Sequence, residues 1–221
     1  MSKKGAIIAL AWPQTKVAQE GKWYDVPMCW FGFVKNGYYT VGHAAFVLVN
    51  FKTLEFKYYD FGRYHTPAKQ GRVRTYDTDP ELKLTTKAIV VNGKVKNIEE
   101  LMTELQTKKA CHGDGELWAS AYYNINLEKA IQKAEQMQDK GAICYGPLHL
   151  KGTNCSRFVS QVTKASTTCN LMKLKLTLPY TISASPKFNI RIINHSIKYY
   201  VLDKPEDTVI ENKTLIPKLS W

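Results

Sequence analysis

The segment Gly152-Thr153-Asn154-Cys155-Ser156-Arg157-Phe158-Val159 joins a polar, glycine-containing loop to a predicted helix over about 155–164. Cys155, Phe158, Val159 and Val162 share one face of that helix. Cys155 therefore lies in the first turn, where unpaired backbone amides and the positive end of the helix dipole favour a thiolate over a thiol. Because the thiolate is the nucleophilic form, the position suits a catalytic cysteine. It also suits a small buried core residue, and position alone does not separate the two.

A cysteine nucleophile needs a base, and His43 is the best placed of the five histidines. It follows Gly42 and begins the apolar run 44–49, which predicts an imidazole held at the mouth of a strand. His65 and His149 lie in predicted loops and receive no role. His195 lies in the C-terminal tail and is likewise unassigned.

The acid that orients the imidazole is predicted from a hairpin. If the turn lies at 51–54, position 43 pairs with about position 62, and Asp60 lies on the same sheet face, one diagonal step from His43. A shift of one residue in this register turns Asp60 to the other face. Glu55, at the end of the turn, is then the fallback acid.

These residues resemble a known family. The run 154–159 resembles the Asp-Cys-Ser-Gly-Phe-Val nucleophile motif of the NlpC-type cell-wall peptidases, which are papain-like, and Tyr145-Gly146-Pro147 matches the tyrosine that the family carries upstream. Gly42-His43-Ala44-Ala45-Phe46 resembles its base-bearing strand. Because His43 precedes Cys155, the order resembles that of the circularly permuted branch, which includes proteins like lecithin:retinol acyltransferase. Tyr58-Tyr59-Asp60-Phe61-Gly62 resembles the second-strand motif of that branch.

The resemblance implies a fold and a set of roles. The implied fold class is α+β, a papain-like (permuted NlpC-type) core whose antiparallel sheet packs against the helix that bears the nucleophile. Cys155 is then the nucleophile, His43 the base and Asp60 the acid that holds the imidazole. Tyr145 supports the oxyanion site. Asn154 and Arg157 depart from the family pattern, which has an Asp and a small residue there. We assign both to the oxyanion or substrate side, and the charge of Arg157 predicts contact with a substrate carboxylate or phosphate.

The rest of the chain predicts segregated strands and helices. We predict a single domain over 1–221, in which 170–221 is a C-terminal extension or a closing sheet segment. Residues 64–84, with Pro67 and Pro80, are predicted as a long loop, and the tail from Leu174 on as strand-like. The other predicted elements are a buried strand over 6–12, turns at Asn36-Gly37 and Asn92-Gly93, helices beginning at Asn97 and Asn126, and strands over 188–193 and 199–202.

The composition limits the class of protein. With 221 residues, 44% hydrophobic, the chain can bury a core without disulfides. Five cysteines at irregular spacing are poor evidence for a disulfide framework, so we expect a reducing compartment and a cytoplasmic location. No stretch approaches the roughly 20 apolar residues that span a bilayer. The apolar run 6–12 is also shorter than the core of a usual signal peptide.

The predicted function is a cysteine-nucleophile hydrolase, an amidase or peptidase that cleaves cell-wall-type peptides through an acyl-enzyme. An acyltransferase or thioesterase acting on lipid-like substrates is the alternative. A non-catalytic module is the rival of another class, because a net charge of +12 attracts anionic polymers or lipid surfaces. No nucleic-acid motif is present. We expect no cofactor and no metal, since Cys111, His112, Asp114 and Glu116 have the spacing of neither paired cysteines nor an HExxH helix.

Overall fold

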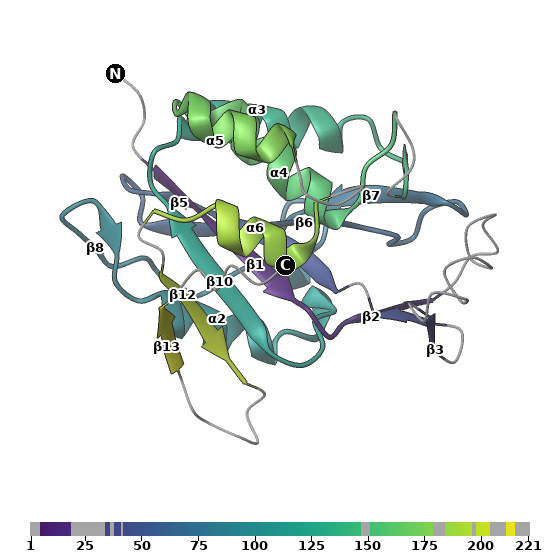
Figure 1. Cartoon of the computed structure of the whole chain (residues 1–221), viewed down its shortest axis with the longest axis horizontal. Helices are drawn as coiled ribbons and strands as arrows, with labels where there is room; N and C mark the ends of the chain where they lie inside the picture. Colours follow the sequence, from purple (N-terminus) through teal and green to yellow (C-terminus); the bar gives the residue numbers. More distant parts are fainter. Residues whose placement is uncertain are drawn as a thin grey trace.

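The computed structural model describes residues 5–18, 34–35, 38–40, 42–146, 151–178, 184–195, 198–203 and 211–214. Its centre is an eight-stranded sheet in the order β11-β7-β6-β5-β1-β10-β12-β13 (Figure 1). Every neighbouring pair in it is antiparallel. The strands are β1 (Gly5–Trp12), β5 (His43–Asn50), β6 (Glu55–Gly62), β7 (Gln70–Arg74), β10 (Leu117–Tyr122), β11 (Ile143–Cys144), β12 (Lys198–Leu202) and β13 (Glu211–Thr214).

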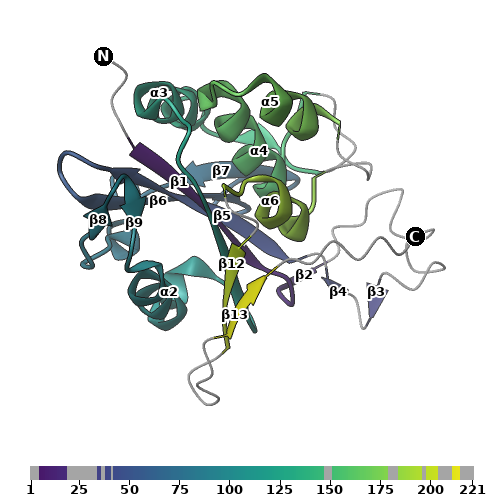
Figure 2. The same cartoon turned by 60° about the vertical axis from the view of Figure 1, so that its left-hand side comes forward.

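Helices cover both faces of this sheet, so the fold is mixed α and β (Figure 2). Four helices lie on one face: α3 (Leu127–Gln138), α4 (Cys155–Ser166), α5 (Asn170–Thr177) and α6 (Pro186–Ile192). The other face carries α2 (Ile98–Thr107) and a short hairpin of β8 (Val90–Val91) and β9 (Lys94–Val95). The remaining elements are β2 (Lys16–Ala18), β3 (Val34–Lys35), β4 (Tyr38–Thr40), η1 (Pro80–Leu82) and η2 (Lys109–Cys111).

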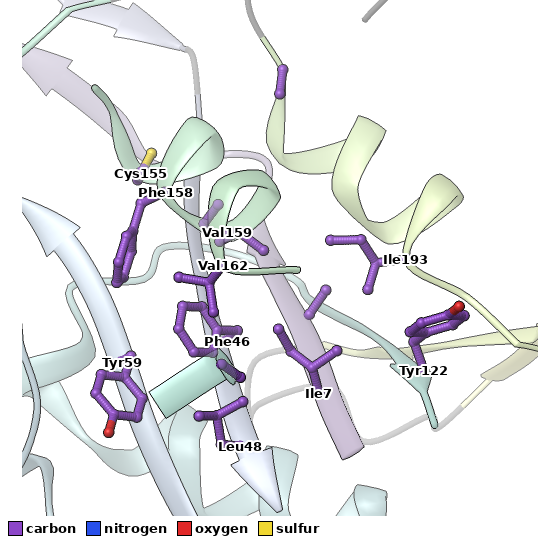
Figure 3. Close-up of a cluster of buried hydrophobic side chains, with 14 of the residues drawn as sticks. Ile7, Phe46, Leu48, Tyr59, Tyr122, Cys155, Phe158, Val159, Val162 and Ile193 are labelled. Carbon is purple, nitrogen blue, oxygen red and sulfur yellow. The ribbon is translucent and has the colours of Figure 1, made fainter. Parts of the chain in front are cut away.

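The two faces bury two separate cores because side chains alternate along each strand. On β1, Ile7 belongs to the core beneath α4 and Ile8 to the core above α2. All eight residues of β1 are buried, as the apolar run predicts for a central strand covered on both sides. Figure 3 shows the core beneath α4, where Phe158 packs against Phe46, with ring centroids 5.2 Å apart.

Several predicted elements are confirmed. The helix that starts at Cys155 is α4, and the hairpin around Asn92-Gly93 is β8–β9. Asn126 caps α3, since its side chain accepts a hydrogen bond from the backbone N–H of Lys129. Asn97 precedes α2 as predicted, but its side chain bonds elsewhere and makes no cap. The turn predicted at Asn36-Gly37 lies outside the described residues.

Other predictions about the chain are wrong. The loop predicted over 64–84 contains β7, which pairs with β6. The tail predicted as strand-like from Leu174 on contains the end of α5 and the whole of α6. Phe188 and Ile190 alternate as in a strand, but Ser185 caps a helix and Pro186 occupies its first turn. The tail does return to the sheet as β12, within which the strand predicted at 199–202 lies.

Within the described residues, no helix is long and apolar enough to span a membrane.

Candidate active site

The β5–β6 hairpin carries His43 and Asp60 in the register that the sequence predicts. Ala45 pairs with Asp60, so His43, two residues earlier on β5, lies diagonally from the carboxylate on the same face. Gly42 precedes it with φ +72°, and a Cβ there would lie 2.9 Å from the carbonyl oxygen of Trp12. The indole of Trp12 stacks on the imidazole with ring centroids 5.8 Å apart. Glycine and tryptophan together fix the ring at the start of the strand.

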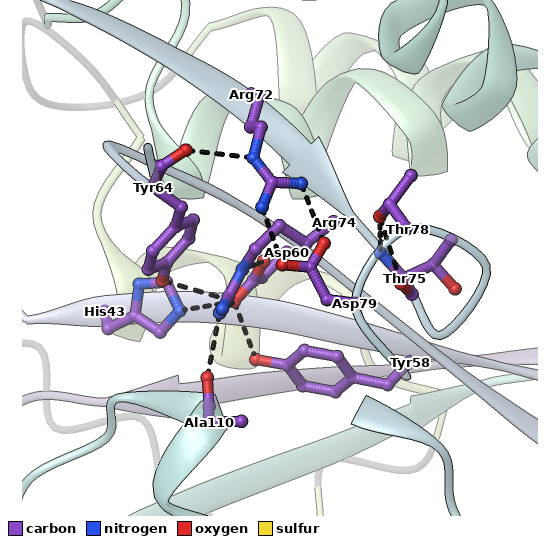
Figure 4. A network of polar contacts seen from close by, with 10 residues as sticks. All are labelled: His43, Tyr58, Asp60, Tyr64, Arg72, Arg74, Thr75, Thr78, Asp79 and Ala110. Carbon is purple, nitrogen blue, oxygen red and sulfur yellow. Dashed lines mark hydrogen bonds and ion pairs between the residues drawn. The ribbon is translucent and has the colours of Figure 1, made fainter. Parts of the chain in front are cut away.

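The imidazole is close to Asp60 but not well bonded to it. Nε2 of His43 lies 3.4 Å from Oδ2 of Asp60, a distance of an ion pair (Figure 4). The geometry is not that of a hydrogen bond, and Nε2 is buried with no hydrogen-bond partner among the described residues. Asp60 is fully buried. Of the predicted site residues, these two are therefore brought together, although loosely.

Asp60 is held instead by three residues that the sequence reasoning missed. Arg74 donates from Nε to Oδ1 at 3.0 Å and from Nη2 to Oδ2 at 2.6 Å. The hydroxyls of Tyr58 and Tyr64 donate to Oδ2 at 3.1 and 3.2 Å (Figure 4). Arg74 is opposite Asp60 on β7, the strand that was predicted as loop. A prediction of a strand over 70–74 would have placed Arg74 opposite Asp60.

These donors decide the charge state of the acid. Burial alone raises the pKa of the Asp60 carboxyl, but His43 and Arg74 hold it below its ordinary value. Asp60 is thus a carboxylate in the folded protein. A carboxylate in this position stabilises a protonated imidazole.

Cys155 is the first residue of α4, as predicted. Oδ1 of Asn154 accepts a hydrogen bond from the backbone N–H of Arg157 at 2.8 Å, which caps the helix. The cysteine is 6% exposed and borders the core beneath α4 (Figure 3). Asn154 therefore affects the site at least by capping the helix that begins with Cys155.

The thiol and the imidazole shift each other's pKa. Burial alone raises the pKa of Cys155, but the interactions with His43 and with the backbone of Ala44 bring it below its ordinary value. Burial alone lowers the pKa of His43, but Asp60 and Cys155 raise it to about 9. Both shifts favour a thiolate–imidazolium pair. Cys111 is a useful contrast, because burial raises the pKa of its thiol to about 12.

Tyr145, another residue predicted for the site, lies beside the Cys155 thiol. Its hydroxyl lies 4.0 Å from Sγ of Cys155, within range of a weak hydrogen bond to sulfur. The ring stacks on Phe61 with centroids 5.8 Å apart and planes 4° apart. A bridge between Tyr145 and Thr153 ties this residue to the loop that leads into the nucleophile. The guanidinium of Arg63 lies 5.5 Å from the centroid of the Tyr145 ring.

The two halves of the site come from opposite faces of the sheet. Strand alternation puts His43 and Asp60 on the face that α2 covers, whereas Cys155 belongs to α4 on the other face. They meet at the beginning of β5. A cavity of about 650 Å³ opens there, onto His43 and Tyr145.

The wall of this cavity is strongly basic. Among the described residues, its charged side chains are Lys16, Arg63, Lys108 and Lys109, against one carboxylate, that of Asp114. Arg157 is not one of the described residues that line the cavity. An anionic ligand fits such a cavity better than a cationic one.

Cys111, His112, Asp114 and Glu116, which were weighed as metal ligands, do not gather into one group. In the described ranges, no group of three or more His, Cys, Asp or Glu side chains has the arrangement of a metal site. His112 instead stacks on Tyr64 at the cavity wall, with centroids 5.2 Å apart.

Two comparisons with known proteins agree with one another. The family model described as "Type VI secretion system effector TseH-like" matches residues 7–171, about three quarters of the chain. The crystal structure of the type VI secretion system effector TseH superposes with a TM-score of 0.58, covering 96% of this chain and 99% of that chain. The two sequences are 16% identical, so this likeness concerns the fold. No curated protein sequence matches the chain significantly.

Proposed function

The chain belongs to the TseH-like family of type VI secretion system effectors, and on this premise we propose that it is an effector that cleaves amide bonds in cell-wall-type peptides. Cys155 is the nucleophile, His43 the base and Asp60 the orienting acid. One arrangement carries the proposal: Cys155 begins α4 with the Tyr145 hydroxyl 4.0 Å from its Sγ, and His43, itself 3.4 Å from Asp60, lowers the pKa of the Cys155 thiol.

The fold proposed is a permuted papain-like domain over 1–221. The base and acid on the β5–β6 hairpin precede the nucleophile helix in the chain, and the helix packs against the same sheet. Residues 170–221 contribute α5, α6 and the strands β12 and β13 at one sheet edge. Geometry, and not chain order, defines such a site, so the permuted order is compatible with the chemistry.

In the acylation step, the thiolate of Cys155 attacks the carbonyl carbon of the amide. The carbonyl oxygen takes up the negative charge beside the backbone N–H of Cys155, with the Tyr145 hydroxyl in support. The carbon–nitrogen bond then breaks, and the imidazolium of His43 gives its proton to the departing amine. The product of this step is a thioester on Cys155.

In the second step, neutral His43 takes a proton from water, and the resulting hydroxide attacks the thioester carbonyl. The carbon–sulfur bond breaks, which releases the acid and restores the thiolate. Asp60 stabilises the imidazolium in both steps, and Arg74 keeps Asp60 ionised. No cofactor takes part in this scheme.

The proposed substrate is an anionic peptide, in keeping with the basic cavity. As an effector, the chain would be carried to that substrate by its secretion system. The cytoplasmic location expected from the cysteines remains a prediction.

The test is an incubation of the recombinant chain with a γ-D-glutamyl peptide, followed by mass spectrometry of the fragments. Wild type is expected to release a free amine and an acid, and Cys155→Ala to release neither. A chelator is expected to leave the rate unchanged, whereas a metal-dependent hydrolase would lose its activity. Full activity in Cys155→Ala would reject the proposal. Transfer of the acyl group to an added amine, instead of water, would favour the acyltransferase alternative.

A further inference from the structure

Oδ2 of Asp60 has more donors around it than it can accept well. Arg74, Tyr58 and Tyr64 donate to it at 2.6, 3.1 and 3.2 Å. Nε2 of His43 is a fourth neighbour, at 3.4 Å. A carboxylate offers about four acceptor sites, hence about two on each oxygen. His43 is the neighbour left without a hydrogen bond.

Of the three donors to Oδ2, Tyr64 is the one whose hydrogen bond a ligand can displace. Arg74 is fixed by Oδ1 and by the carbonyl oxygen of Ala110 as well as by Oδ2. The side chain of Tyr58 is 1% exposed and belongs to the core above α2. Tyr64 lines the cavity, between the ring of His112 and the guanidinium of Arg74, which lies 3.3 Å from its ring centroid. A ligand in the cavity can therefore reach Tyr64 and not Tyr58.

We propose that Tyr64 is a positioning residue, whose hydroxyl competes with His43 for Oδ2 of Asp60. The inference rests on the proposed function of this site. When the Tyr64 hydroxyl leaves Oδ2, the N–H of His43 closes onto the carboxylate, which stabilises the imidazolium and with it the thiolate of Cys155. A substrate that accepts a hydrogen bond from Tyr64 brings about this closure.

Among the described residues, the charged and titratable groups that act on His43 are Asp60 on β6, Cys155 on α4 and His112 after η2, with Arg74 of β7 behind Asp60. The same cavity is also lined by Lys16, Arg63, Lys108, Lys109 and Asp114. Tyr64→Phe alters none of their charges and keeps the aromatic ring. The substitution therefore isolates the hydrogen bond from the electrostatic background.

The experiment measures the pH at which iodoacetamide labelling of Cys155 is half-maximal, in wild type and in Tyr64→Phe. Tyr59→Phe is the matched control, because it also removes a buried hydroxyl, on β6 next to Asp60, but Tyr59 belongs to the core beneath α4. One released hydrogen bond is expected to lower the midpoint by about half to one pH unit in Tyr64→Phe. Tyr59→Phe is expected to match wild type. An unchanged or higher midpoint in Tyr64→Phe overturns the inference.

The second readout is the proton resonance of the Nε2–H of His43 in ¹H–¹⁵N spectra. It is expected to move downfield in Tyr64→Phe as the bond to Asp60 closes, and an unmoved resonance counts against the inference. Thermal unfolding checks that both variants are folded. The two proposals fail in different ways. If wild-type Cys155 labels as an ordinary thiol, insensitive to His43→Ala, the proposed function fails. If wild type behaves as expected and Tyr64→Phe does not differ from it, only the role of Tyr64 fails.

Discussion

Arg74 lies directly opposite Asp60 across β6 and β7 and bonds to both of its carboxylate oxygens. Both side chains are almost completely buried. Removing one charge of such a pair leaves the other buried without compensation, at a cost of about 3–5 kcal/mol. We therefore expect Asp60→Asn to lower the free energy of unfolding by about this amount, measured by urea denaturation.

Asp79→Asn is the matched control, since Asp79 forms a bidentate pair with Arg72, whose side chain is 23% exposed. Solvent there replaces part of the lost interaction, so the loss of stability is expected to be smaller. Equal losses in the two variants would contradict the account of Asp60 as a buried, charge-paired acid.

Asn154 and Asn126 cap α4 and α3 in the same way, and so they form a natural comparison. Replacing either by alanine is expected to destabilise the protein by about 1 kcal/mol. Only Asn154→Ala is expected to slow the alkylation of Cys155 at neutral pH, because only this cap fixes the helix start at the thiol. A similar slowing in Asn126→Ala would mean that the effect is one of general stability.

The pH dependence of the activity follows from the shifts at Cys155 and His43. In the proposed mechanism, the thiolate–imidazolium pair is expected between the lowered pKa of Cys155 and the raised pKa of His43, about 9. We expect kcat/KM to fall as the pH rises through about 9, where His43 no longer has a proton for the leaving amine. The raised pKa of His43 also stabilises the fold fully below the unfolded pKa of about 6.5, and this contribution disappears as the pH rises through the folded value.

A profile from pH 5 to pH 10 on one peptide decides this prediction. A rate that keeps rising through the alkaline range, as for an unassisted thiol with a pKa of about 8.5, would contradict it. In His43→Ala, Cys155 is expected to lose its labelling advantage below neutral pH.

We expect Arg63 and Arg157 to contribute differently to substrate recognition. Arg63 lines the cavity beside Tyr145, whereas the described lining of the cavity does not include Arg157. A charge-assisted hydrogen bond contributes about 1.5–3 kcal/mol, so Arg63→Gln is expected to raise KM for a peptide carboxylate at least about tenfold. Arg157→Gln is expected to change KM less.

The control substrate is the same peptide with its carboxylate amidated. Wild type and Arg63→Gln are expected to bind it equally. If Arg157→Gln has the larger effect on the carboxylate substrate, the sequence-based assignment of Arg157 as the anion contact stands and that of Arg63 fails.

The parts of the site that the sequence predicts are those set by local rules. The position of Cys155 follows from a loop–helix junction, and that of Asp60 from the position of the hairpin turn. Such features depend on neighbours close in the chain. The register in particular is fixed once the turn at 51–54 is known.

The parts that it misses depend on partners distant in the chain. β7 carries Arg72 and Arg74, whose charges argue against a strand until Asp79 and Asp60 are known to neutralise them. Tyr64 is a loop residue in the structure as well, and only the folded chain brings it beside Asp60 and His112. Burial of a charged side chain is a tertiary property, so no periodicity in the sequence contains it.

The division of the site between a local hairpin and a distant helix affects how the protein acquires its reactivity during folding. His43 and Asp60 are joined by one short turn, whose closure costs little chain entropy, whereas α4 reaches them only after the intervening strands and helices are in place. The hairpin is therefore able to form early, with base and acid aligned and no nucleophile to activate. If the proposed function holds, Cys155 is an ordinary thiol until α4 docks, and a nascent or partly unfolded chain is expected to have no hydrolytic activity. Under the same proposal, the onset of fast alkylation at Cys155 is expected to mark the completion of long-range assembly.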